Sequence, residues 1–402
     1  MKKNEIVLLL TLAMVQFTHI LDSMIMMPMA PVIRNSFSIS TQQFGFLVSS
    51  YGLSAFVSAI SATFWIDRFD RKKVLTFLYI GFLAGTLACA LSPDYSFFII
   101  ARIFTGLFGG IAGAVILSIV GDCIPVERRA HAMGILMSGF AMASVIGVPL
   151  GIWLSEKFSW HSPFLFICII GAPVLAAVFF LIPNVNSHID SSQKKSPFVL
   201  YQRVFSSSNM RTALLLSMFV VFAHFAIIPY ISDYFVHNLN FRMADQLILM
   251  YVIGGLLSTI SSPFIGKIAD RKGRYKVFFF LSVLAIFPIF MISNFNSHSL
   301  PFLLFTTSLF FIFSGGRMIP TQAMVTSAVE PSIRGGFMSL NSATQQLSIG
   351  LCSLLGGTII KNDELKHLVN YNIVGMIGIL FTVLAIFAGF KLKAVTSPLQ
   401  KK

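Results

Sequence analysis

Twelve long apolar segments follow one another along this chain, and they constrain its fold more than any other feature. They lie near residues 6–32, 44–66, 74–92, 97–121, 131–154, 163–182, 212–236, 245–268, 276–294, 300–326, 336–360 and 370–391. About 20 apolar residues form a helix long enough to cross roughly 30 Å of hydrocarbon, and a helix satisfies its own backbone hydrogen bonds there. The sequence therefore predicts an all-α membrane protein with twelve transmembrane helices and both termini on one side.

Composition and the distribution of charge agree with this prediction. The chain is 56% hydrophobic and only 11% charged, which excludes an ordinary water-soluble globule. Its net charge of +14 suggests a nucleic-acid partner until the basic residues are sorted by loop. The two termini and the loops after even-numbered segments hold 22 of the 29 lysines and arginines. The positive-inside rule then places both termini in the cytoplasm and accounts for the charge without nucleic acid.

Sequence motifs for cofactors and catalysis are absent. Cys89, Cys123, Cys168 and Cys352 fall in separate apolar segments, so neither disulfides nor a metal site is expected. No GxxxxGK[ST] loop is present for ATP, and neither HExxH nor GxSxG occurs in a supporting context, which argues against an intramembrane enzyme. The N-terminal apolar run lacks an A-x-A cleavage pattern, so we expect it to remain as the first span.

A short basic loop occurs twice. The stretch GKIADRKGRYK covers Gly266 to Lys276, and a second copy lies exactly 203 positions upstream, where Asp67 matches Asp270 and Arg71 matches Arg274. We infer a duplicated chain with an N-terminal six-helix bundle (1–182), a cytoplasmic linker (183–211) and a C-terminal six-helix bundle (212–402).

This loop and the duplication resemble the major facilitator superfamily over essentially the whole chain. The family motif reads roughly GxLaDRxGRK; the second copy fits it closely, whereas the first has Thr63 and Asp70 in place of glycine. The resemblance implies two six-helix bundles related by a pseudo-twofold axis, which rock about a central cavity so that a site near the midplane faces each side in turn.

The resemblance also implies a conformational latch in these loops. Asp67 is expected near the start of the eleventh span, and Arg71 is expected to pair with Asp122 at the end of the fourth. In the second copy the latch residues are Asp270, Arg271 and Arg274. The alternative is that these charges only set the topology.

Asp22 is the most informative single residue, because an ionised carboxylate within a span is expensive without a partner. Burial disfavours its charged form, so it can take up and release a proton. Arg102, in the fourth span at a suitable depth, is the expected partner. The run RIFTG, Arg102 to Gly106, resembles the fourth-span motif of the family, in which an arginine takes part in proton transfer. The alternative role for Asp22 is purely structural.

Other candidate residues lie in the spans expected to line the cavity. Gly147, Pro149 and Gly151 resemble the fifth-span signature of antiporters, with helix packing at a proline kink as the alternative. Arg317 has no obvious carboxylate partner in the sequence, and a lone histidine in a span can equally be hydrogen-bonded to a neighbouring helix. The candidate substrate-cavity residues are Gln16, His19, His224, Tyr230, Arg317, Gln322, Asn341 and Gln345.

These features favour a proton-coupled exporter of a drug, sugar or metabolite, closest in motifs to the 12-span drug and sugar efflux antiporters. The alternative is a proton-coupled symporter that imports an organic anion held by Arg317. A channel would need no coupling carboxylate. The expected partners are a small-molecule substrate, protons and membrane lipid, with no cofactor, and we expect a monomer in the bacterial inner membrane.

Overall fold

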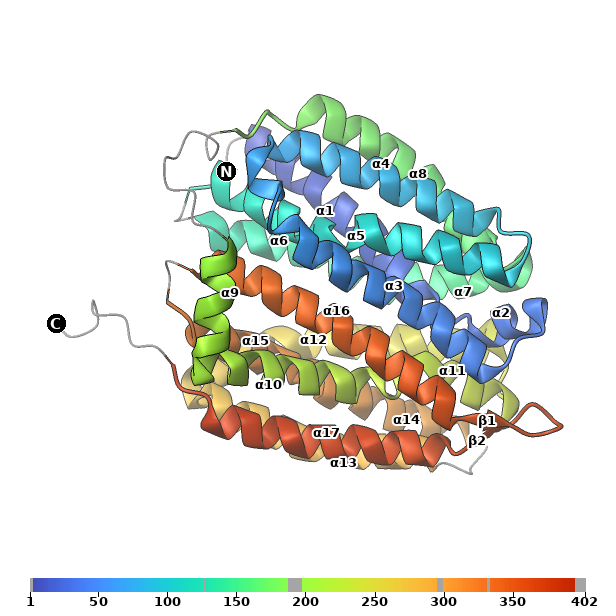
Figure 1. Ribbon diagram of the computed structural model, residues 1–402. Coiled ribbons are helices and arrows are strands. Elements are labelled where there is room, and N and C mark those ends of the chain that lie inside the picture. Colours follow the sequence, from blue (N-terminus) through green and yellow to red (C-terminus); the bar gives the residue numbers. More distant parts are fainter. Residues whose placement is uncertain (1–2, 126–127, 187–196, 295–298, 331–332, 395–402) are drawn as a thin grey trace. The chain divides into compact units, whose positions relative to one another are not determined.

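The computed structural model is almost entirely helical (Figure 1) and describes residues 3–125, 128–186, 197–294, 299–330 and 333–394. Within these residues, eleven helical segments are long and apolar enough to cross a membrane. They are Asn4–Ile25, Thr41–Ala62, Arg71–Ala90, Tyr95–Cys123, His131–Lys157, Ser162–Leu181, Ser208–His237, Met243–Lys272, Arg274–Ser293, Leu300–Ser327 and Tyr371–Lys391. The remaining predicted span forms α16 (Arg334–Ile359), which has 26 residues but a more polar sequence. The predicted all-α membrane fold is confirmed.

Several spans are interrupted. The first predicted span (6–32) is in fact two helices, α1 (Lys3–Ile25) and α2 (Ala30–Phe37). Pro28 lies in the turn between them and lacks the N–H group that would continue α1, whereas Pro31 is tolerated in the first turn of α2. Four later spans contain more than one helical segment. They are α6 (Arg129–Met142), η3 (Ala143–Gly147) and α7 (Val148–Lys157); α10 (Ser208–Phe225) and α11 (Ile228–His237); η4 (Met243–Leu247) and α12 (Ile248–Lys272); and α14 (Leu300–Phe310), η5 (Phe311–Gly315) and α15 (Met318–Ser327).

The chain forms two compact units. Unit 1 comprises 1–39, 46–194 and 243–252, and unit 2 comprises 40–45, 195–242 and 253–402. In unit 1, α4 (Arg71–Ala90) packs along α5 (Tyr95–Cys123) and α8 (Ser162–Leu181). Gly106 lets α5 approach α3 (Thr41–Ala62), because a Cβ there would lie 2.5 Å from the Tyr51 carbonyl oxygen.

In unit 2, α17 (Tyr371–Lys391) packs along α10 and α13 (Arg274–Ser293). The short helix α9 (Pro197–Ser206) crosses the ends of α10 and α16 (Figure 1) and buries Val204 in their core. Strands β1 (Lys361–Asn362) and β2 (Leu368–Val369) form a two-stranded antiparallel hairpin between α16 and α17.

The two copies of the repeated loop start their next helices differently. Asp70 is the N-cap of α4, and its carboxylate accepts hydrogen bonds from the backbone N–H groups of Lys72 and Lys73 at 2.8 and 3.2 Å. Gly273 is the N-cap of α13 and has a φ of 97°, a conformation that favours glycine. The aspartate that departs from the family pattern therefore supplies a side-chain cap where the second copy uses backbone freedom.

Candidate functional site

The centre of unit 1 holds a buried ion pair. Arg102 Nη1 donates a hydrogen bond to Asp22 Oδ2 at 2.8 Å, and both side chains are at most 2% exposed. Thr86 Oγ1 lies 3.2 Å from the other carboxylate oxygen, Oδ1. Spans formed by α1, α4 and α5 thus contribute to one polar centre. The structure brings together the two residues that the sequence assigned to proton coupling.

Aromatic and imidazole side chains extend this centre. The Arg102 guanidinium carbon lies 4.4 Å from the centre of the Tyr51 ring, and the Tyr51 hydroxyl lies 3.1 Å from His19 Nε2. The imidazole ring of His19 also packs near the Phe82 ring, with the ring centroids 5.8 Å apart. His19 therefore belongs to the same cluster as Asp22. Gln16 lies one turn earlier on α1, half-buried, and its Oε1 has no hydrogen-bond partner among the described residues.

Local sequence features position this cluster. Asp94 is the N-cap of α5 and accepts a hydrogen bond from the Phe97 N–H at 2.9 Å, which fixes the start of the helix that carries Arg102. Tyr51 and Thr86 were not selected from the sequence. A threonine in an apolar span often hydrogen-bonds only to its own helix, and a tyrosine in a span commonly serves as a packing residue. Nothing in the sequence therefore marks these two as contacts of an ion pair.

Unit 2 contains a second buried arginine with different partners. Arg317 directly precedes α15 and is fully buried; its Nη1 donates to Thr382 Oγ1 at 2.9 Å and its Nη2 to Ser314 Oγ at 3.4 Å. Its Nε has no hydrogen-bond partner in the described part of the chain. Within the described part of the chain, no carboxylate lies within 4.0 Å of it. His224 Nδ1 reaches the same Ser314 hydroxyl at 3.0 Å.

The remaining candidate cavity residues of unit 2 lie in different environments. Tyr230 is fully buried on α11 and donates a hydrogen bond to the Ser353 carbonyl oxygen of α16. Asn341 is buried on α16, and its Oδ1 has no partner among the described residues. Gln345 is half-buried on the same helix, whereas Gln322 is exposed on α15. No hydrogen bond joins these four side chains into one cluster.

The latch residues also separate into groups. Arg71 Nε lies 2.6 Å from Asp122 Oδ2, so this expected pair is present. The Asp67 side chain lies outside the described part of the structure, and its expected contact stays a prediction.

In the second copy, Arg274 Nη1 donates to the Ala323 carbonyl oxygen at 3.1 Å. Its Nε is 3.9 Å from Asp270, which is 73% exposed, and Arg271 is exposed as well.

The antiporter-like residues in the fifth span pack against the first. Gly147 ends the π-helical stretch η3, and a Cβ there would lie 2.8 Å from Leu21 Cδ1. Gly151 packs against Ile25, and Pro149 occupies the first turn of α7. These residues allow close approach to the helix that carries Asp22.

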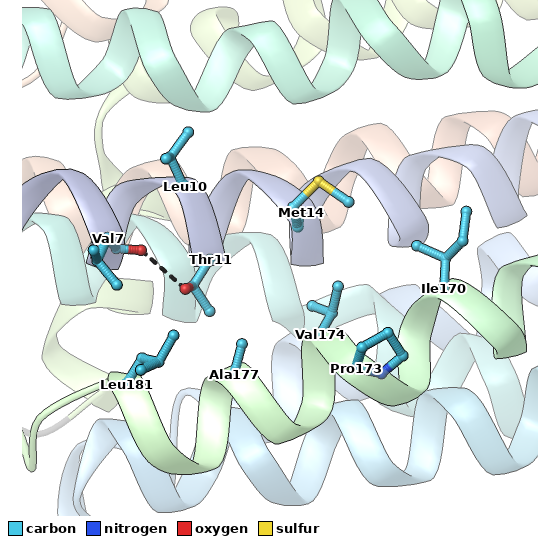
Figure 2. Close-up of a pocket in the computed structure, with 9 residues that line it drawn as sticks. All are labelled: Val7, Leu10, Thr11, Met14, Ile170, Pro173, Val174, Ala177 and Leu181. Atoms are coloured by element: carbon cyan, nitrogen blue, oxygen red, sulfur yellow. Dashed lines mark hydrogen bonds between the residues drawn. The ribbon is translucent and has the colours of Figure 1, made fainter.

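An apolar groove of about 430 Å³ lies between α1 and α8 (Figure 2). Its only polar side chain, Thr11, donates a hydrogen bond to the Val7 carbonyl oxygen at 2.9 Å within α1. The groove therefore offers no free polar group to a ligand, and it suits hydrocarbon. Its lining residues are Val7, Leu10, Thr11, Met14, Ile170, Pro173, Val174, Ala177 and Leu181. Among the described residues, no cluster of histidine, cysteine and carboxylate side chains is arranged to hold a metal ion.

Comparison with known sequences identifies similar proteins. The sequence model of the Major Facilitator Superfamily matches residues 12–297 and 244–402. The inner membrane transport protein YdhP of Escherichia coli (strain K12) is 26% identical over 371 residues, with 90% of each chain covered. A probable sugar efflux transporter of Mannheimia succiniciproducens is 24% identical over 350 residues, covering 86% of this chain and 83% of that one.

Solved structures share the fold. The D-xylose-proton symporter aligns with a TM-score of 0.73 at 17% identity, covering 95% of this chain and 96% of that chain. A bacterial homologue of the human lysosomal transporter Spinster aligns with a TM-score of 0.72 at 16% identity, covering 99% and 100% of the two chains. At this level of identity the likeness establishes the architecture of the chain.

Proposed function

This chain belongs to the major facilitator superfamily, and from that premise we propose that it exports a small organic molecule in exchange for protons by alternating access. The observation that carries the proposal is the buried Asp22–Arg102 pair in unit 1. Buried ionisable groups within spans are costly, and they commonly mark proton or substrate pathways. No cofactor is needed, because the proton gradient supplies the energy.

Asp22 is the proton carrier in this proposal, and Arg102 is its counter-charge. A proton that binds Asp22 Oδ2 breaks the ion pair, and its release to the other side allows the pair to form again. The hydroxyl of Thr86, 3.2 Å from Oδ1, provides a neutral contact for the carboxyl group in both states.

The conformational part of the proposal follows the family mechanism. Two six-helix bundles, 1–182 and 212–402, move as bodies joined by the linker 183–211. The Arg71–Asp122 pair, with Asp67 in the same loop, stabilises one state, and Asp270, Arg271 and Arg274 act in the second loop. The positive-inside rule supports a cytoplasmic location for these loops and both termini, and the membrane in this proposal is the inner membrane of a bacterium.

Export is favoured over import by two observations. The fifth-span residues Gly147, Pro149 and Gly151 resemble the antiporter signature and pack against the helix that carries Asp22. One similar protein is named a probable sugar efflux transporter. We therefore propose a drug, sugar or metabolite as the exported substrate, handled by a monomer.

A substrate screen in proteoliposomes with an imposed pH gradient tests the proposal. Wild type should accumulate its substrate when the gradient is applied, whereas Asp22→Asn should retain exchange between labelled and unlabelled substrate but lose accumulation. Asp94→Asn is the matched control, because asparagine also caps a helix and Asp94 lies outside the buried centre. Equal gradient-driven accumulation by wild type and Asp22→Asn would remove Asp22 from the mechanism.

A second candidate is proton-coupled import of an organic anion. It is favoured by Arg317, a buried cation without a carboxylate within 4.0 Å among the described residues. Right-side-out and inverted vesicles separate the two candidates. Uptake with protons into right-side-out vesicles supports import, and uptake against protons into inverted vesicles supports export.

A further inference from the structure

Arg317 has the least compensated charge in the buried part of unit 2. Its side chain is fully buried within the span Leu300–Ser327, and its hydrogen-bond partners are the hydroxyl groups of Thr382 and Ser314. A guanidinium stays protonated in proteins, so it cannot avoid this cost by losing its proton. A buried charge is tolerated when it is paired, and the described residues supply no anion within salt-bridge distance.

Hydroxyl and imidazole groups surround Arg317. Ser314 Oγ accepts a hydrogen bond from Arg317 Nη2 at 3.4 Å and lies 3.0 Å from His224 Nδ1, where the imidazole tautomer decides which of the two groups donates. His224 stacks on Phe310 with ring centres 5.1 Å apart and planes 5° apart. The imidazole is thereby held in place beside the serine.

The backbone of the tenth span is irregular at this position. Ser314 lies in the π-helical stretch η5 (Phe311–Gly315), which ends two residues before Arg317. Such stretches occur frequently at functional sites, because they interrupt the regular helix and redirect side chains. Arg317 Nε is fully buried and has no hydrogen-bond partner among the residues that the structure describes, so the guanidinium still has an unused donor there. This donor and the missing counter-charge are independent observations, and both indicate an anionic ligand.

We propose that Arg317, with Ser314 and His224, binds the carboxylate group of the transported molecule. A planar guanidinium matches a carboxylate with two parallel hydrogen bonds, and Nε with one Nη group forms a suitable pair of donors. The substrate is then an organic acid, and its carboxylate supplies the counter-charge that Arg317 lacks among the described residues. This inference rests on the proposed transport function, and it holds for either direction of transport.

Thermal unfolding of the purified full-length protein in detergent, with a panel of organic carboxylates and their neutral amides, tests the site. Saturable protection of wild type by at least one carboxylate, without protection by its amide, is the expected result. Arg317→Gln should raise the apparent dissociation constant at least about 10-fold, the effect of losing charge-assisted hydrogen bonds. Arg203→Gln on the exposed face of α9 is the matched control and should bind as wild type does.

Two further variants keep the test informative if Arg317→Gln does not fold. Ser314→Ala and His224→Gln retain the arginine and should each weaken carboxylate protection by about 2- to 10-fold, as expected for one neutral hydrogen bond. Equal protection of wild type and these variants by carboxylates would overturn the proposal. So would protection by chloride or phosphate alone, or protection of lipid-depleted protein by anionic lipid alone.

The failure of this site and the failure of the proposed function give different results. If the site is correct, Asp22→Asn keeps protection by the carboxylate even though it loses gradient-driven accumulation. If Asp22→Asn accumulates substrate normally while Arg317→Gln loses protection, proton coupling through Asp22 is wrong and the carboxylate site stands.

Discussion

Among the described residues, unit 1 and unit 2 each bury one arginine within a span, but only the arginine of unit 1 is paired with a carboxylate. Arg102 lies 2.8 Å from Asp22, whereas Arg317 donates to the hydroxyl groups of Thr382 and Ser314. A paired charge is compensated within the protein, and a lone one still requires an anion. The difference shows that two halves with a common sequence repeat carry different chemistry. One holds an arginine paired with a carboxylate, and the other holds an arginine hydrogen-bonded to neutral hydroxyl groups.

The repeated loops differ in the same way. Arg71 binds the Asp122 carboxylate, and its counterpart Arg274 binds the Ala323 carbonyl oxygen. Asp70 caps its helix with a side chain, and Gly273 does so with a backbone conformation at positive φ. Unit 1 therefore uses charged groups where unit 2 uses its backbone.

The largest expected effect comes from breaking the pair in unit 1. Arg102→Met leaves Asp22 buried without its partner, so the free energy of unfolding should fall by about 3–5 kcal/mol. Unfolding in mixed detergent micelles measures this change. The double variant Asp22→Asn/Arg102→Met should recover a large part of the loss, because no unpaired charge remains. A double variant as unstable as the single one would show that packing, and not charge, explains the effect.

A smaller effect is expected at the two helix starts. Gly273→Ala forces a side chain into the positive-φ region and should cost about 1–3 kcal/mol in the same unfolding assay. Asp70→Ala should cost about 1 kcal/mol, and Asp70→Gly only a few tenths. If Asp70→Gly proved more damaging than Gly273→Ala, the two loops would not differ in the way described above.

The loop arginines should show a still smaller difference. The Arg71 and Asp122 side chains are 12% and 25% exposed, so solvent screens their attraction, and Arg71→Ala should cost at most about 1 kcal/mol. Salt should reduce this cost, whereas the cost of Arg274→Ala should depend less on salt, because its hydrogen-bond partner is a neutral carbonyl group and its 3.9 Å contact with the exposed Asp270 is weak. Unfolding at low and high ionic strength measures both. A salt-independent effect for Arg71→Ala would contradict the ion-pair interpretation.

Removing Arg317 gives the sharpest contrast with Arg102, because its expected net effect on stability is close to zero. Arg317→Met removes a buried charge that the protein does not compensate, so the lost hydrogen bonds and the relieved desolvation should nearly cancel, within about 1 kcal/mol. The hydroxyl of Thr382 keeps its bond to the Gly378 carbonyl oxygen at 2.9 Å. A loss as large as that of Arg102→Met would mean that Arg317 has a structural role equal to that of the ion pair.

Much of this contrast was foreseeable from sequence, but not its details. Asp22 and Arg102 could be matched because both are charged, both lie in spans, and their depths along those spans agree. Thr86 and Tyr51 could not be assigned to this centre from the sequence. A neutral side chain adds little free-energy cost to a span, and its partner depends on how each helix is rotated about its axis. The same rotation decides that Arg317 meets Thr382, a residue 65 positions away in the chain.

The sequence by itself determined that the chain is an all-helical membrane protein with a repeated loop in each half. The length and hydropathy of each apolar segment, and the loop repeated 203 positions apart, can be read without knowing which helices pack together. The tertiary structure decided which buried charges are compensated. That outcome depends on distances of a few ångströms between side chains on different helices, and it makes Asp22 and Arg102 one centre while leaving Arg317 among neutral groups.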